Sequence, residues 1–269
     1  MMNFKNVVLI VIYKMPISQS KTFKTINKQL RNEDLLILYD NSPNKELDIS
    51  LKANYQYIHD NQNNGLIDAY NFSIKRAYEV GATWVTFFDQ DSEIPDNFFE
   101  DTKKLENTVL QNVVSIVPKV FVKQIKISPF SSTYSLFRVK KNQIDTAINS
   151  GNTVRVDFWK QLSLEFDRNF QLDFLDYFFF KKVKDYGMKF VVSTISINHS
   201  LSSSNYKTMN FKRYNDFLKS ENRFVQSYYG KWRITSYKFK LVLRVIKLLL
   251  MNGGLDKIDI TLKYIFETR

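Results

Sequence analysis

The sequence predicts an α/β fold in which a mostly parallel sheet is flanked by helices. Strand-like and helix-like patterns alternate over the first 118 residues, and the first apolar run, residues 7–13, is continuous, as in strands covered on both faces. The 269 residues are 44% apolar and 15% aromatic, which is enough for a substantial core. Ligands of such sheets bind at the carboxyl ends of the strands.

The first half of the sequence supplies most of the predicted strands. After the strand at residues 7–13, Pro16 and Ser18 open a segment in which Phe23, Ile26 and Leu30 recur at helical spacing. Further strands are predicted at residues 35–39, 55–59, 83–88 and 113–117, and a helix at residues 66–80 that ends at Gly81. Turn-forming residues 41–44 and polar residues 60–65 separate these elements.

The pattern changes after residue 118. Residues 119–149 have the pattern of β-rich excursions, with strand candidates at 121–127 and 135–139. The turn at residues 149–151 precedes a short helix at 156–162, a helix at 175–186 and a strand at 190–197. From residue 205 the pattern is helical, basic and aromatic, broken at Gly253-Gly254. We therefore divide the chain into an α/β domain, 1–204, with halves 1–118 and 119–204, and a helical C-terminal segment, 205–269.

The charge of the chain is concentrated in its last quarter. There are 39 Lys plus Arg and 27 Asp plus Glu, a net charge of +12. Residues 201–269 hold 14 basic and 5 acidic residues, a net of +9, which leaves +3 for residues 1–200. Such a basic segment points to a phosphate-bearing ligand, a nucleic acid or an anionic membrane as partner.

Several classes of protein are excluded or disfavoured by composition. The absence of cysteine excludes a disulfide scaffold, a thiolate zinc site and a cysteine nucleophile. No apolar run approaches the roughly 18 to 20 residues that cross a bilayer. The run at residues 7–13 is short and continues into Lys14-Met15-Pro16 without a small-residue cleavage site, so it is predicted to be a buried strand rather than a signal peptide. We expect a cytoplasmic protein.

A pair of aspartates follows the predicted strand at residues 83–88. Side chains alternate along an extended chain, so Asp89 and Asp91 are expected on one side. Two close carboxylates suit a hard divalent cation such as Mg²⁺ or Mn²⁺, with nucleotide phosphates completing its coordination. His199, just after the strand at 190–197, is a candidate third ligand. The alternatives are an ordinary acidic turn and a surface histidine.

Other acidic residues occupy comparable positions. Asp40 closes the second strand, where it would accept a hydrogen bond from the N–H of a uracil or thymine base; the alternative is that it caps the turn. Tyr13 would lie against the ring of the base; the alternative is that it belongs to the core. Asp173 and Asp176 share one face at the start of a helix. A carboxylate there is suited to act as a general base toward a hydroxyl, or simply to cap the first turn.

Taken in order, these segments resemble the family 2 inverting glycosyltransferases of the GT-A fold, and most of all their bacterial rhamnosyltransferase-like branch. The resemblance spans about residues 6–200. The matching segments are residues 7–13, 39–42, Asn64-Gly65 with Asn71, 84–92, 149–151, 170–177 and His199. The Gln-x-x-Arg-Trp signature of processive synthases is absent, since Lys231-Trp232-Arg233 does not match it, so the resemblance implies single-sugar addition.

The resemblance implies roles for individual residues. It makes residues 1–118 the donor-binding half and 119–204 the acceptor half. Tyr13, Asp40, Asn64 and Asn71 would bind a UDP- or dTDP-linked sugar, with Asp89, Asp91 and His199 holding Mn²⁺ or Mg²⁺ beside its phosphates. Asp176 would be the catalytic base, with Asp173 as the alternative. In related sequences an acidic residue often follows the second aspartate by two positions, where this chain has Phe178.

The C-terminal segment bears on the acceptor. Between residues 228 and 251, six cations interleave with apolar residues, a composition typical of helices that lie in a membrane interface. A glycan or lipid-diphosphate-linked acceptor in bacterial surface polysaccharide synthesis, such as that of the capsule or cell wall, and a peripheral position on the inner face of the membrane would fit. The alternative is that the apolar stripe packs on the catalytic domain or on a second subunit in a homodimer.

Two other functions fit part of the pattern. A nucleotidyltransferase shares such a sheet and paired aspartates, but it is expected to have a glycine-rich phosphate loop near its start, and no glycine precedes Gly65. A non-enzymatic basic protein that binds nucleic acid or membrane would explain the charge. Carboxylates gathered at strand ends would repel a nucleic acid, so we expect no nucleic-acid partner.

Overall fold

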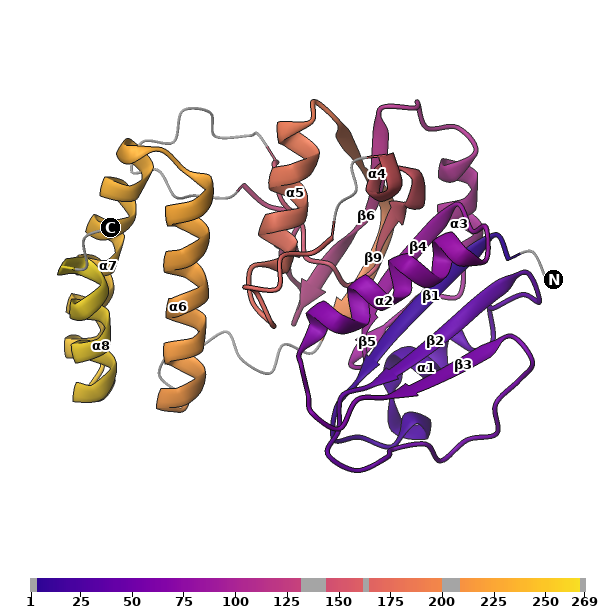
Figure 1. The fold of residues 1–269 in the computed structure, drawn as a ribbon, viewed down its shortest axis with the longest axis horizontal. Coiled ribbons are helices and arrows are strands. Elements are labelled where there is room, and N and C mark those ends of the chain that lie inside the picture. Colours follow the sequence, from indigo (N-terminus) through magenta and orange to yellow (C-terminus); the bar gives the residue numbers. More distant parts are fainter. Residues whose placement is uncertain (1–3, 132–143, 162–164, 200–208, 267–269) are drawn as a thin grey trace. The chain divides into compact units, whose positions relative to one another are not determined.

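The computed structural model describes residues 4–131, 144–161, 165–199 and 209–266 (Figure 1). The chain forms two compact units: unit 1 is Met1–Phe130 with Asp145–Ser200, and unit 2 is Ser131–Ile144 with Leu201–Arg269. Within the described ranges, no helix combines the length and the apolar character needed to cross a membrane. The strand predicted at 135–139 lies outside the described residues.

Unit 1 is built on one sheet, which has nine strands in the described part of the chain. Their order is β3-β2-β1-β4-β8-β6-β9-β5, with β7 paired to β6. The pairs β3–β2, β2–β1, β1–β4 and β6–β9 are parallel, and the other pairs are antiparallel. The strands are β1 (Asn6–Ile12), β2 (Asp34–Asp40), β3 (Tyr55–His59), β4 (Trp84–Asp89), β5 (Ser92–Glu93), β6 (Val113–Val122), β7 (Ile125–Ser128), β8 (Asn152–Arg155) and β9 (Lys189–His199).

Helices cover both faces of this sheet, as two neighbouring residues of β4 illustrate. Phe87 stacks on Tyr70 of α2, with ring centroids 4.6 Å apart, whereas Phe88 packs edge-on against Phe98 of α3 at 5.2 Å. Because successive side chains point to opposite faces, both faces of β4 are core. The helices of unit 1 are α1 (Lys21–Ile26), α2 (Leu66–Glu79), α3 (Phe98–Glu106), α4 (Val156–Gln161) and α5 (Leu175–Asp185), with a 3-10 turn at Ile17–Gln19.

The α/β fold class is confirmed, but several elements differ from the prediction. Helix α1 ends at Ile26, so Leu30 lies beyond it. The single strand expected at 121–127 is a hairpin, since Lys123 and Gln124 both have positive φ angles and turn β6 back into β7. Helix α3 was not predicted, because only Phe98 and Thr102 are buried along its nine residues and its apolar pattern is weak.

The strand ends converge on one edge of the sheet. In the parallel registers, Ile12 of β1 lies beside Asp40 of β2, and Val11 lies beside Asp89 of β4. Strand β9 runs parallel to β6 and ends at His199, which pairs with Ser92 just after the aspartates. Residues as far apart in the sequence as Asp89 and His199, 110 positions, therefore meet at the carboxyl edge, where ligands of parallel sheets bind.

Unit 2 consists of three contacting helices in its described part, α6 (Phe211–Tyr228), α7 (Lys231–Leu250) and α8 (Leu255–Phe266). Its centre holds an ion pair, in which two guanidinium nitrogens of Arg244 donate to the two carboxylate oxygens of Glu221 at 2.6 and 3.0 Å. The predicted break at Gly253-Gly254 is present, and a second break at Tyr229-Gly230 separates α6 from α7.

Candidate active site

The loop that carries Asp89 and Asp91 is braced by the start of α1. The Thr22 hydroxyl donates to the Asp89 carbonyl at 2.5 Å and accepts from the Ser92 amide at 3.0 Å. The Ser20 hydroxyl, which also caps α1, donates to the Gln90 carbonyl at 2.8 Å. These contacts fix the backbone on both sides of the two carboxylates, so their side chains start from a rigid platform.

Asp89, Asp91 and His199 form a cluster. One oxygen or ring nitrogen from each lies within 4.8 Å of the corresponding atoms of the other two, and all three side chains are partly buried. The His199 ring is held by a chain of short contacts, with Nδ1 2.8 Å from the Ser92 hydroxyl and that hydroxyl 2.8 Å from the Ser150 hydroxyl. Nδ1 is also 3.4 Å from Asp91 Oδ1. The orientation of the imidazole ring is therefore fixed by contacts with neighbouring side chains, as is usual for histidines that bind a metal.

Burial and neighbouring charges shift the pKa values of both aspartates in the cluster. Burial raises the pKa of Asp89, the nearby Asp91 carboxylate raises it further, and His199 lowers it. Burial likewise raises the pKa of Asp91, against the lowering effects of His199 and Lys21. Two carboxylates and an imidazole are the oxygen and nitrogen donors that Mg²⁺ and Mn²⁺ accept, and a divalent cation would relieve the repulsion between the carboxylates. The donor set therefore fits such an ion.

Asp176 lies in the electrostatic neighbourhood of this cluster. Burial raises its pKa to about 7, and the charges of Asp173 and Asp89 add to the effect. The Tyr177 amide donates to Asp176 Oδ1 at 2.8 Å, which opposes the shift. A carboxylate with a pKa near neutral pH is a better proton acceptor than an ordinary aspartate.

The backbone next to Asp176 is strained. Phe174, between Asp173 and Leu175, has φ +70° in the left-handed region, which a bulky side chain rarely adopts. Its ring is 4% exposed and packs 5.0 Å from the ring of Tyr177, so packing maintains the strained turn. Strain of this kind is concentrated at functional sites, and here it sets the direction from which α5 begins.

Tyr70 lies within electrostatic reach of both Asp89 and Asp176, and its place at the site was not predicted from the sequence. It is 2% exposed, and burial together with the charges of Asp89 and Asp176 raises its pKa well above the ordinary value. A hydrogen bond with the Asn149 side chain opposes that shift. In the sequence, Tyr70 is indistinguishable from the other apolar residues on the inner face of α2.

The turn at residues 149–151 also has a clear structural reason. Gly151 has φ +80°, and an added Cβ would lie 2.7 Å from Pro118 Cγ and 2.6 Å from Ile197 Cδ1. Its amide donates to the Phe87 carbonyl at 2.7 Å, next to the aspartates on β4. Glycine is thus needed where this turn passes close to the sheet, and the turn delivers Ser150 to Ser92.

Asp40 is fully buried, and its carboxylate accepts hydrogen bonds from the loop that follows it and from β3. Its carboxylate accepts from the Ser42 amide at 2.9 Å, the Glu46 amide at 2.8 Å and the Tyr57 hydroxyl at 2.6 Å. Burial raises the pKa of Asp40, but these hydrogen bonds outweigh it and the pKa is lowered. The contacts are those of the turn-capping alternative, and a contact with a base stays a prediction. Tyr13 is 40% exposed, and its backbone is clamped by the Gln90 side-chain amide.

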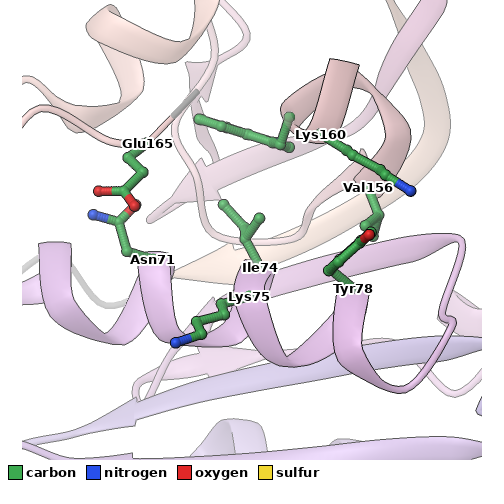
Figure 2. A pocket seen from close by; sticks show the side chains of 8 residues that line it. Asn71, Ile74, Lys75, Tyr78, Val156, Lys160 and Glu165 are labelled. Atoms are coloured by element: carbon green, nitrogen blue, oxygen red, sulfur yellow. The ribbon is translucent and has the colours of Figure 1, made fainter. Parts of the chain in front are cut away.

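The two predicted asparagines have structural partners. Asn64 bonds Asp60 within its own loop, and Asn71 exchanges hydrogen bonds with the backbone of Phe166. Asn71 also lines a cavity of about 280 Å³ between α2 and α4, to which none of the Asp89, Asp91 and His199 side chains contributes. Figure 2 shows Asn71 beside Glu165 at one end of this cavity and Lys160 with Tyr78 at the other. A donor-binding role for Asn64 and Asn71 stays a prediction.

The comparison with protein families identifies the chain. The model of glycosyl transferase family 2 matches residues 8–163, more than half of the sequence. The chain belongs to this family. The matched range of this glycosyltransferase includes Asp89 and Asp91, whereas Asp173, Asp176 and His199 lie beyond it. No protein of curated function matches the chain.

Solved structures agree on the GT-A fold of this glycosyltransferase. S. aureus TarS 1–349 in complex with UDP matches with a TM-score of 0.53 at 14% identity, over 97% of this chain and 82% of that one. The complex of the same protein with UDP-GlcNAc gives 0.52 at 13% identity, over 97% and 82%. A mannosyltransferase from Pyrobaculum calidifontis, in complex with GDP-Man and Mn²⁺, gives 0.55 at 11% identity, over 98% and 88%.

Proposed function

We propose that this glycosyltransferase moves a single sugar, with inversion, from a nucleotide-sugar to an acceptor hydroxyl in a metal-dependent reaction. The observation that carries the proposal is the gathering of Asp89, Asp91 and His199 at the carboxyl edge of the sheet, within the electrostatic reach of Asp176. Membership of the family favours glycosyl transfer over a nucleotidyltransferase or a non-enzymatic basic protein.

The donor is proposed to be a UDP- or dTDP-linked sugar, with dTDP-rhamnose or a UDP-hexose as the leading candidates. The three structures named above contain UDP, UDP-GlcNAc and GDP-Man, which supports a nucleotide-sugar as the class of donor. The proposed base-binding position is the exposed Tyr13, which follows Ile12, the register partner of Asp40; Asn64 and Asn71 are proposed as further donor-binding residues.

The metal is proposed to be Mn²⁺ or Mg²⁺, held by Asp89, Asp91 and His199. The similarity to TarS and to the mannosyltransferase is a similarity of fold. A bound ion is supported by the clustered ligand atoms of Asp89, Asp91 and His199 in this chain and by the Mn²⁺ in the mannosyltransferase structure. When bound, the ion would stabilise the negative charge that develops on the departing nucleotide diphosphate.

Asp176 is proposed to be the general base. As the acceptor oxygen bonds to the anomeric carbon, the acceptor O–H bond breaks, its proton passes to an Asp176 carboxylate oxygen, and the bond from the anomeric carbon to the diphosphate oxygen breaks. A single displacement of this kind inverts the anomeric configuration. The raised pKa of Asp176 favours proton uptake, and Asp173, three residues earlier, is the alternative base.

The acceptor is proposed to be a glycan or a lipid-diphosphate-linked saccharide of bacterial surface polysaccharide synthesis, for the capsule or the cell wall. The net charge of +9 on residues 201–269 supports an acceptor at an anionic surface, with the enzyme peripheral on the inner face of the cell membrane.

A donor screen tests the reaction. The chain is incubated with UDP- and dTDP-linked sugars, with Mn²⁺, with Mg²⁺ or with a chelator, and nucleotide diphosphate release and the anomeric configuration of the product are followed by NMR. We expect one donor to be consumed in a metal-dependent way, with inversion in any glycoside formed. Retention of configuration, or equal turnover with the chelator, would contradict the proposal.

A further inference from the structure

Helix α7 of unit 2 has two apolar faces. Its buried face consists of Tyr237, Leu241, Arg244 and Leu248, each at most 6% exposed. These residues recur at spacings of three and four, as expected for the side of a helix that packs on its neighbours. Helix α7 contacts α6 and α8, and these four residues are its buried side.

The second apolar face points away from the first. At 100° per residue, five residues of α7 fall within an arc of about 60° opposite the buried face. All five are between 47% and 89% exposed: Trp232 89%, Phe239 48%, Leu243 49%, Ile246 47% and Leu250 82%. We call these residues the outer stripe. A regular apolar stripe of this length on an exposed helix face indicates a surface that is covered in function.

Cations border the outer stripe on both sides. By the same helical geometry, Arg233, Lys240 and Lys247 lie along one edge, and Lys231 and Lys238 along the other. Residues 231–250 contain no acidic residue. Arg244, on the buried face, donates two hydrogen bonds to Glu221, and Lys240 Nζ lies 3.7 Å from the same carboxylate. Lys231, Arg233 and Lys247 are exposed, so cations on both sides of the outer stripe reach the surface.

We infer that the outer stripe docks on an anionic lipid bilayer, with its apolar side chains in the interface and its bordering cations at the headgroups. The combination of an apolar stripe and cations on both flanks is complementary to such a surface, because each long cationic side chain can reach the headgroups while its stem covers apolar surface. The inference deepens the proposed function, since it identifies how a lipid-linked acceptor is approached.

Two other occupants fit less well. A second copy of this helix would bring the bordering cations of both copies together, at a cost in repulsion. A nucleic acid would satisfy the cations but would leave Leu243, Ile246 and Leu250 without an apolar partner. The bilayer is the occupant that uses both parts of the surface.

Vesicle sedimentation of the full chain tests the inference. Vesicles of phosphatidylcholine with phosphatidylglycerol are compared with vesicles of phosphatidylcholine alone, without donor or metal. We expect the chain to sediment with the anionic vesicles, less at high salt. The double variant Leu243→Gln with Ile246→Gln should bind at least about tenfold more weakly. The double variant Lys231→Gln with Lys247→Gln should bind about twenty-fivefold more weakly, at about fivefold per cation.

The matched control replaces two equally exposed apolar residues of unit 1. Leu110→Gln with Ile125→Gln, at 71% and 69% exposure, should bind vesicles like the unaltered chain. Circular dichroism verifies that each variant is folded. Equal binding by the outer-stripe variant, no binding of the unaltered chain, a dimer in sedimentation velocity that the stripe variant abolishes, or binding to RNA but not to vesicles would each overturn the inference. Because the assay needs no donor, its failure would leave the transfer reaction standing.

Discussion

The two units of the chain treat buried acidic groups in opposite ways. In unit 2, Glu221 is 1% exposed and is neutralised by two hydrogen bonds from Arg244, with Lys240 3.7 Å away. At the sheet edge of unit 1, burial raises the pKa values of Asp89, Asp91 and Asp176, and the lowering effects of His199 on the first two and of Lys21 on Asp91 do not cancel this rise. The first arrangement serves folding, whereas the second leaves negative charge for an ion and a proton to occupy.

The largest effect is expected at Asp176. Asp176→Asn removes the proton acceptor but keeps the size of the side chain, so turnover should fall by about 10² to 10⁴-fold. Donor binding, measured by calorimetry, should change little. Asp185→Asn, on the exposed end of the same helix, is the control and should retain full turnover. If Asp173→Asn loses turnover while Asp176→Asn does not, the base is Asp173.

Breaking the buried ion pair should have the next largest effect, on stability. Arg244→Met removes both guanidinium hydrogen bonds from the buried Glu221 carboxylate and should lower the free energy of unfolding by about 3 to 5 kcal/mol. Replacing both residues, Glu221→Leu with Arg244→Met, should cost less than the single change. Chemical denaturation measures both. An equal loss in the single and double variants would show that packing, and not the isolated charge, sets the cost.

At Asp176, an effect of opposite sign on the free energy of unfolding is expected: removing this carboxylate should stabilise the fold above neutral pH. The pKa of Asp176 is raised from 3.8 to about 7, so the folded state favours the protonated form and loses stability as pH rises from about 4 to 7. Asp176→Asn should therefore be more stable than the unaltered chain above pH 7, by up to about 4 kcal/mol, and equal to it below pH 4. Unfolding curves across this range, with a chelator present, provide the test. A difference that is independent of pH would rule out the charge as its cause.

The smallest effect is expected at Glu33, a surface carboxylate that two lysines contact. Hydrogen bonds from Lys103 and Lys5 lower the pKa of Glu33 to about 2. The resulting contribution to the free energy of unfolding is present above about pH 4.5 and is lost as pH falls toward 2. Solvent screening limits it to less than about 1 kcal/mol. Glu33→Gln should thus change the unfolding midpoint only slightly, and less still at high salt. A loss as large as that of Arg244→Met would contradict the contrast between exposed and buried charges.

The sequence was informative where a pattern is local. The strand rhythm, the position of Asp89 and Asp91 after a buried strand, and the helix break at Gly253-Gly254 could all be read directly. The supports of the site could not, because they join distant segments: Thr22 reaches Asp89, and Ser150 reaches His199 through Ser92. Ser20 could have been noticed as a helix cap, but nothing in the sequence tells which loop it braces.

The same limit applies to the charged helix α7. Its composition predicted an apolar stripe and left open whether the stripe packs on protein or lies on a membrane. The structure contains two stripes on opposite sides, one buried and one exposed, and a linear sequence does not separate them until the packing partners are known.

Binding of Mn²⁺ tests the central claim, that the acidic cluster of unit 1 holds a divalent ion. Titration followed by electron paramagnetic resonance, in the presence of UDP, is made on the unaltered chain, on Asp91→Asn and on Asp96→Asn, an exposed aspartate five residues further on. We expect one site in the unaltered chain and in Asp96→Asn, and affinity lower by at least about tenfold in Asp91→Asn. Equal affinity in all three proteins would contradict the account.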